Sequence, residues 1–125
     1  MFIQYNPNPK GRRVGDCVIR ACCKALDEGW EQVYMDICLK GFAMADMPSS
    51  NAVWGAYLKS RGFKKRVLED SCPDCYTLKT FCADHSRGLY VVQTGNHVVT
   101  VLDGNYFDTW DSGDEIVVFY WTKKG

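Results

Sequence analysis

An excess of charge of either sign is missing from this 125-residue chain, which carries fifteen basic and fifteen acidic side chains. Nucleic-acid-binding proteins draw much of their affinity from a basic face that neutralises phosphates. The basic residues here are scattered along the sequence, and Lys64-Lys65-Arg66 is the longest run. We interpret that run as the solvated end of a strand and expect no nucleic-acid partner.

Long apolar runs are missing as well. No stretch approaches the roughly 20 apolar residues that span a bilayer. Residues 1–10 also lack the basic and then apolar pattern of a secretory signal. We therefore expect no membrane partner and a cytoplasmic location.

The seven cysteines form an odd set. Cys22 and Cys23 are adjacent within a helical pattern, where a mutual disulfide is geometrically unfavourable. Together with the missing signal, this favours free thiols in a reducing compartment.

What the chain does have is a globular composition, since 46% of its residues are hydrophobic. Such a composition excludes the low-hydrophobicity pattern of disorder. The length suits one domain over residues 1–125, and no repeat, low-complexity tract or linker divides it.

The first half of the sequence has helical periodicity. Residues 16–27 place an apolar stripe on one side, with Gly15-Asp16 as the N-terminal cap; the stripe consists of Val18, Ile19, Cys22, Cys23 and Leu26. The pattern predicts three further helices and two short strands. The helices are expected at residues 30–43, at residues 52–61 after a cap at Ser50 or Asn51, and at residues 77–85, and the strands at residues 2–5 and 64–69.

The second half changes character and becomes rich in β-branched and aromatic residues. Four such runs predict strands, at residues 89–94, 97–103, 105–110 and 115–123. Helices followed by strands are typical of an α+β fold. We therefore expect N-terminal helices packed on a C-terminal antiparallel β-sheet.

Cys17 lies at the expected start of the first helix. The unpaired N–H groups and the dipole of a helix N-terminus lower the pKa of a thiol placed there. The helical period also puts Cys17 roughly opposite the apolar stripe, unlike Cys22 and Cys23. Cys17 is therefore the candidate nucleophile.

His97 is the candidate base, because it opens an apolar strand directly after Gly95-Asn96, where a helix terminus packed across the sheet can reach it. The aspartate that orients this base depends on the turn at Asp103-Gly104. A two-residue hairpin turn puts Asp108 on the same sheet face as His97. A three-residue turn brings Asp111 there instead. We favour Asp108 and keep Asp111 as the alternative.

A tetrahedral intermediate also needs hydrogen-bond donors for its oxyanion. The backbone N–H of Cys17 at the helix start is one candidate. The side-chain amides of Asn8, Asn6 and Gln4, from the segment that precedes the helix, are candidates for the second donor.

The order of these parts, GDCVIRA at a helix start and later GNHVVTVLDGNYFDTW in a hairpin, resembles papain-like cysteine peptidases. It is most similar to the compact bacterial double-glycine peptidases, and it also looks like small phage and prophage proteins of that superfamily. Those peptidases usually carry a glutamine a few residues before the nucleophile and a glycine directly after it. Here Gly11 stands six residues before Cys17, and Val18 follows Cys17.

The resemblance implies a papain-like fold, a Cys-His-Asp triad and a peptide or protein substrate, with no cofactor. The expected activity is that of a thiol peptidase, which cleaves an amide or isopeptide bond through an acyl-enzyme. Two alternatives use the same fold: an acyltransferase with the same triad, and a catalytically inactive binding protein such as a phage-borne inhibitor of a host factor. The sequence leaves the oligomeric state open.

Two further sets of residues invite a functional interpretation. One is a set of zinc-type ligands with spacing shorter than that of usual zinc fingers, Cys72, Cys75, Cys82 and His85. We interpret it as buried thiols beside a surface histidine, and we expect no metal. The other consists of Trp54 and Trp110, which are candidates for the wall of a substrate groove, although such aromatics more often belong to the core.

Overall fold

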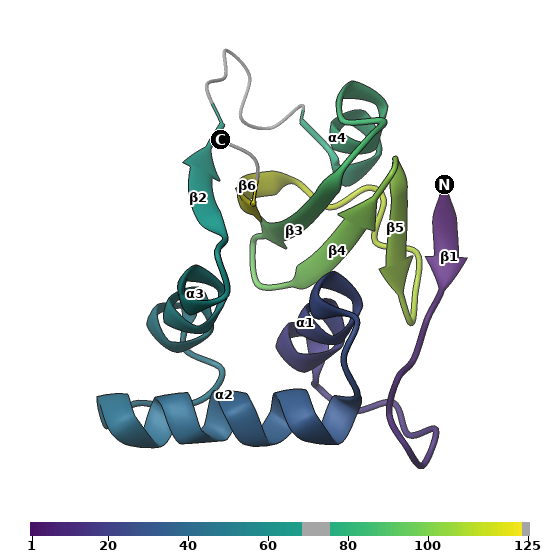
Figure 1. Cartoon of the computed structure of the whole chain (residues 1–125). Coiled ribbons are helices and arrows are strands. Elements are labelled where there is room, and N and C mark those ends of the chain that lie inside the picture. Colours follow the sequence, from purple (N-terminus) through teal and green to yellow (C-terminus); the bar gives the residue numbers. More distant parts are fainter. Residues whose placement is uncertain (69–75, 124–125) are drawn as a thin grey trace.

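The computed structural model describes residues 1–68 and 76–123. Within these ranges the chain forms an α+β fold, as the sequence predicted (Figure 1). The helices are α1 (Cys17–Leu26), α2 (Trp30–Met44), α3 (Asn51–Ser60) and α4 (Leu78–Asp84). The strands are β1 (Phe2–Gln4), β2 (Lys64–Val67), β3 (Leu89–Thr94), β4 (Val98–Leu102), β5 (Asn105–Asp108) and β6 (Val117–Thr122). None of the helices in the described part of the chain combines the length and the apolarity needed to cross a bilayer.

All six strands join one sheet, in the order β1-β5-β4-β3-β6-β2. The expectation of a purely antiparallel C-terminal sheet was wrong in one respect. Strand β1 pairs in parallel with β5, with Phe2 opposite Tyr106, so the sheet is mixed. Both edge strands, β1 and β2, precede the four C-terminal strands in the sequence. One of them, β2, carries the basic run, and Lys64 and Lys65 are exposed there.

Two apolar clusters cover opposite faces of the sheet, because neighbouring residues of a strand point to opposite sides. Val91 belongs to the cluster with α1, α2 and α3. Val92 belongs to the cluster with Leu78 and Phe81 of α4. Helix α4 therefore covers the face that the other three helices leave open.

The hairpin between β4 and β5 has the two-residue turn that Asp103-Gly104 predicted. Leu102 is paired with Asn105 across it. Both turn residues have positive φ angles, 50° for Asp103 and 80° for Gly104, as hairpin turns of type I′ require. The turn fixes the register of β5, and with it the position of Asp108.

Helix α1 is more enclosed than its apolar stripe indicated, because it lies between the sheet and α2 (Figure 1). Cys22 and Cys23 are buried, as predicted, but so are Arg20 and Ala21 on other sides of the helix. Val18, Ile19 and Leu26 are only partly buried.

Candidate active site

The first residue of α1 is held beside the start of β4. A buried hydrogen bond fixes the helix across the strand, since the Thr100 hydroxyl of β4 donates to the Ala21 carbonyl at 2.6 Å. Cys17 is half-buried at the N-terminus of α1. Its sulfur lies within reach of the side chain of His97 and of the backbone amide of Val98, and both act on the thiol as hydrogen-bond partners that lower its pKa. The candidate nucleophile and the candidate base are therefore in direct contact.

The ring of His97 connects Cys17 to Asp108. Nε2 of His97 lies 2.6 Å from Oδ2 of Asp108. Because Asp108 occupies Nε2, Nδ1 is the ring nitrogen left for the sulfur. Only 8% of His97 is exposed, so solvent competes little with either hydrogen bond.

Asp108 is completely buried and accepts four hydrogen bonds. Oδ2 accepts from His97 and from the Ser112 hydroxyl, the latter at 2.7 Å. Oδ1 accepts from Nη2 of Arg20 at 3.0 Å and from the backbone N–H of Thr109 at 2.8 Å. With every lone pair directed at a donor, the carboxylate cannot rotate away from the imidazole without losing partners.

Behind Asp108 lies a charged pair that the sequence analysis missed. Nη1 of Arg20 is 2.6 Å from Oδ1 of Asp16, and the indole N–H of Trp30 donates to Oδ2 of Asp16 at 2.9 Å. Asp16 does occupy the N-cap position of α1, but its side chain makes no capping hydrogen bond. The signal that could have revealed this network is the spacing of four between Asp16 and Arg20 on a helix.

The hydrogen bonds across the site lower the pKa of the Cys17 thiol and raise the pKa of the His97 ring. Burial raises the pKa of the Cys17 thiol, but hydrogen bonds from His97 and Val98 outweigh it and leave that pKa below the ordinary value. Burial lowers the pKa of His97, but the bonds to Asp108 and Cys17 outweigh it and raise the pKa to about 9. Both shifts favour a thiolate paired with an imidazolium.

The other thiols of α1 show the opposite behaviour. Burial raises the pKa of Cys23 to about 12, and it raises the pKa of Cys22 as well. The environment thus favours the thiolate at Cys17 and the neutral thiol at its two neighbours.

Asp108 stays ionised in the same site. Burial raises its pKa, but the hydrogen bonds from His97 and Ser112 outweigh this effect and hold the pKa below the ordinary value.

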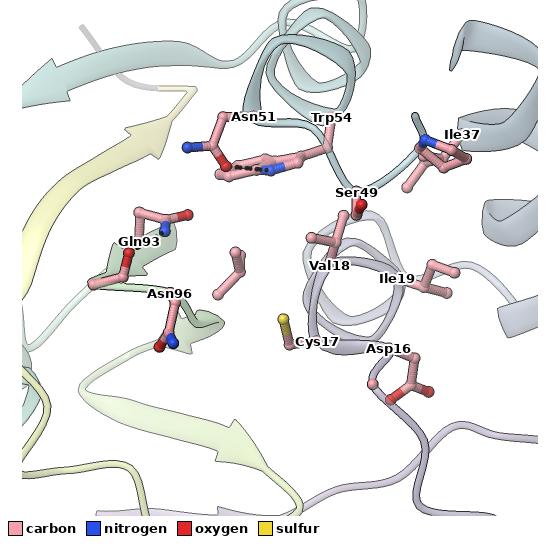
Figure 2. Close-up of a pocket in the computed structure, with 14 residues that line it drawn as sticks. Asp16, Cys17, Val18, Ile19, Ile37, Ser49, Asn51, Trp54, Gln93 and Asn96 are labelled. Atoms are coloured by element: carbon pink, nitrogen blue, oxygen red, sulfur yellow. Dashed lines mark hydrogen bonds between the residues drawn. The ribbon is translucent and has the colours of Figure 1, made fainter. Parts of the chain in front are cut away.

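A hollow of about 420 Å³ opens on one side of the sulfur, between α1, the start of α3 and the β3–β4 turn (Figure 2). Its walls are largely apolar and include Val18, Ile19, Ile37, Trp54 and Val98. Trp54 is 1% exposed, and its indole N–H donates to Oδ1 of Asn51 at 3.0 Å. This tryptophan is both a core residue and a wall of the hollow.

A second hollow, of about 490 Å³, lies on the other side and includes His97 and Arg13 in its lining. Cys17, Gly15 and Asn96 line both hollows. The sulfur therefore lies where the two hollows meet.

Trp110 covers the base from this second side. Its ring centroid is 4.9 Å from that of His97, and 45% of the residue is exposed. Of the two tryptophans that the sequence offered as groove walls, Trp110 is the one with an accessible indole.

The remaining sequence-predicted site residues lie elsewhere. Asp111, the alternative third member, accepts hydrogen bonds from the Tyr106 hydroxyl and from the backbone N–H of Gly113. Neither hollow beside Cys17 includes Asp111 among its lining residues. Since Asp108 holds the His97 ring, the site does not use the alternative.

The side chains of the three candidate oxyanion donors form hydrogen bonds away from Cys17. The side chain of Asn6 donates to the Arg12 carbonyl at 3.2 Å. Oδ1 of Asn8 accepts from two amides of the same loop. The Gln4 amide donates to the Thr109 carbonyl at 3.2 Å. None of these three side chains lines either hollow beside the sulfur.

The zinc interpretation falls partly outside the described residues, since Cys72 and Cys75 lie there. Cys82 is buried against the sheet. The ring of His85 stacks on Phe81 with centroids 4.0 Å apart. Across residues 1–68 and 76–123, no three metal-binding side chains gather closely enough to hold an ion.

No protein-family model, curated protein or solved structure shows a significant match to this chain. The interpretation of the site therefore depends on its own chemistry. That chemistry consists of an activated thiol, a base that is oriented by a buried carboxylate, and two hollows that meet at the sulfur.

Proposed function

We propose that this chain is a cysteine hydrolase of papain-like fold, and specifically a thiol peptidase that cleaves an amide or isopeptide bond. The observation that carries the proposal is the hydrogen-bonded series from Cys17 through His97 to Asp108 at the junction of two hollows. A structural thiol needs neither a base nor access to solvent. This thiol has both.

In the first half of the reaction, the Cys17 thiolate attacks the carbonyl carbon of the substrate and forms a carbon–sulfur bond. The tetrahedral intermediate then expels the amine as the carbon–nitrogen bond breaks. The proton on Nδ1 of His97 passes to the departing nitrogen, which leaves as a neutral amine. Asp108 stabilises the imidazolium before this step and fixes the tautomer after it.

In the second half, water attacks the thioester that links the acyl group to Cys17. His97, now neutral, takes a proton from this water at Nδ1. The carbon–sulfur bond breaks, the acid product leaves, and the thiolate and imidazolium pair is restored. An acceptor amine in place of water would give acyl transfer, which product analysis with and without an added amine detects.

The oxyanion has a first donor in the backbone N–H of Cys17. Because the Asp16 side chain is bonded to Arg20 and Trp30, it does not cap the first turn of α1. Asn96, which is exposed and lines both hollows, replaces the earlier candidates as the second donor.

The test is the rate at which each thiol reacts with iodoacetamide at neutral pH, mapped by peptide mass spectrometry. Cys17 should be alkylated fastest, and His97→Ala should slow it by at least about tenfold, because the thiolate loses its partner. Cys38 is a matched control, since it is also free and partly buried. Its rate should be the same in both proteins.

Slow labelling of Cys17 that does not respond to the loss of His97 would contradict the proposal. That result would favour an inactive binding protein instead.

A further inference from the structure

We infer that the substrate of the proposed peptidase carries an anionic group on its leaving side, which Arg13 binds, and a neutral apolar residue on its acyl side. The inference rests on the proposed function. The shared chemistry is a carboxylate near the scissile nitrogen, supplied either by an acidic side chain or by a free terminal carboxylate.

The direction of the substrate follows from where His97 lies. The departing amine must receive the proton of His97, so the leaving part of the substrate occupies the hollow that His97 lines. That is the hollow with Arg13 and Trp110. The apolar hollow beside α3 does not include His97, and it therefore holds the acyl part.

The hollow on the leaving side is positively charged. Arg13 is exposed there, and no ion pair in the described part of the chain involves it. Arg20 also lines this hollow, but Asp16 and Asp108 balance its charge. None of the described side chains in its lining is acidic. An anionic leaving group therefore meets one uncompensated guanidinium, with the exposed indole of Trp110 in the same lining.

The hollow on the acyl side has no free charge. The one ionisable side chain in its lining apart from Cys17 is Asp16, and both oxygens of Asp16 are hydrogen-bonded, to Arg20 and Trp30. The rest of the walls combine aliphatic and aromatic surface with neutral amides (Figure 2). A charged acyl residue would lose its hydration in this hollow without gaining a partner.

The experiment uses matched peptides in which one aliphatic residue is followed by Glu, Gln or Lys, with cleavage followed by mass spectrometry. A second pair carries Gln as the last residue, with either a free or an amidated terminus. We expect kcat/KM for Glu to exceed that for Gln by about 1.5- to 5-fold, the range of an exposed ion pair, and Lys to be cleaved most slowly. Whichever carboxylate gives the larger ratio identifies its source.

Variants locate the effect at Arg13. Arg13→Gln should bring the ratio between Glu and Gln close to one, and Arg13→Glu should reverse the order of Glu and Lys. Lys10→Gln is the matched control, because Lys10 is an exposed cation of the same segment that lines neither hollow. That variant should keep the wild-type ratio.

The outcomes separate the two proposals. Cleavage of all peptides at equal rates, or a preference that survives in Arg13→Gln, overturns the inference while the peptidase stands. Slow labelling of Cys17 that is independent of His97 overturns the peptidase itself. If Cys17 labels rapidly but no peptide is cut, the rates for iodoacetate and iodoacetamide decide. The ratio of the iodoacetate rate to the iodoacetamide rate at Cys17 must fall in Arg13→Gln and stay at the wild-type value in Lys10→Gln. An unchanged ratio in Arg13→Gln again overturns the inference.

Discussion

Nη2 of Arg20 lies 3.0 Å from Oδ1 of Asp108, and both side chains are almost completely buried. The same guanidinium reaches Asp16 through Nη1. One cation thus joins the first turn of α1 to the end of β5. Since Cys17 follows Asp16 and His97 contacts Asp108, this link connects the helix of the proposed nucleophile to the carboxylate that holds the proposed base.

Replacing Arg20 with Met should destabilise the fold by about 3–5 kcal/mol, because two buried carboxylates lose their shared counter-charge. Arg20→Lys should recover part of this loss, since a lysine retains the charge but not the two-pronged geometry. Urea unfolding monitored by tryptophan fluorescence measures both. Equal free energies of unfolding for the Met variant and the wild type would show that the ion pairs of Arg20 make no net contribution to stability.

Asp108→Asn should reduce kcat by a factor of about 10³ or more, because an amide can donate to Nε2 and stabilise the wrong tautomer of His97. Asp111→Asn is the control, since Asp111 bonds to Tyr106 rather than to the base. Its kcat should remain within about twofold of the wild type. The same comparison can be made with the Cys17 alkylation rate if no substrate is in hand. Equal losses in both variants would argue against the assigned third member.

The pH profile of Cys17 alkylation follows from the two shifted pKa values. The pKa of Cys17 is lowered, so the thiolate should persist well below the pH at which an ordinary thiol is protonated. His97 has its pKa raised to about 9, so peptide cleavage should decline as the pH rises through about 9 and the proton for the leaving amine is lost. The two limbs belong to the coupled pair. If the alkylation rate of Cys17 instead fell with decreasing pH where that of an ordinary thiol falls, the result would contradict the pairing of Cys17 with His97.

The same shift makes stability depend on pH. The pKa of His97 rises from 6.5 to about 9 on folding. The protonated form therefore stabilises the fold fully below pH 6.5, and this contribution is lost as the pH rises through about 9. Because the lowered pKa of Cys17 acts on stability in the opposite direction over part of this range, the comparison is made without that thiol. The free energy of unfolding of Cys17→Ala should fall between pH 7 and 10 more steeply than that of the double variant Cys17→Ala/His97→Gln. Parallel curves for the two proteins would refute the assignment.

Local sequence patterns predicted most of the elements because helix period and cap chemistry act over a few residues. Ser50 does accept a hydrogen bond at the start of α3, and Thr77 does the same for α4. The turn at Asp103-Gly104 was the most informative local signal for the site. Its two-residue length sets the register of β5 and so places Asp108, rather than Asp111, beside His97.

Features that depend on residues distant in the sequence were not predictable in this way. The parallel pairing of β1 with β5 joins Phe2 to Tyr106, and no local pattern encodes such a partner. Arg20 was not singled out from the sequence, because its two carboxylate partners, Asp16 and Asp108, come together only in the folded chain. Asn6 and Asn8 were missed for a different reason, because their side chains bond to the backbone of their own irregular loop, which no regular periodicity describes.

The two groups that act on Cys17 as hydrogen-bond partners, the side chain of His97 and the backbone N–H of Val98, come from far along the chain, and this has a consequence for biosynthesis. A ribosome releases the segment that holds Cys17 long before it makes His97 and Val98, which form hydrogen bonds with the sulfur. Until the late strands dock against α1, this thiol has the reactivity of any unperturbed cysteine. The nascent chain therefore carries a thiol of ordinary reactivity, and the pKa of Cys17 falls only once the C-terminal strands have joined the fold.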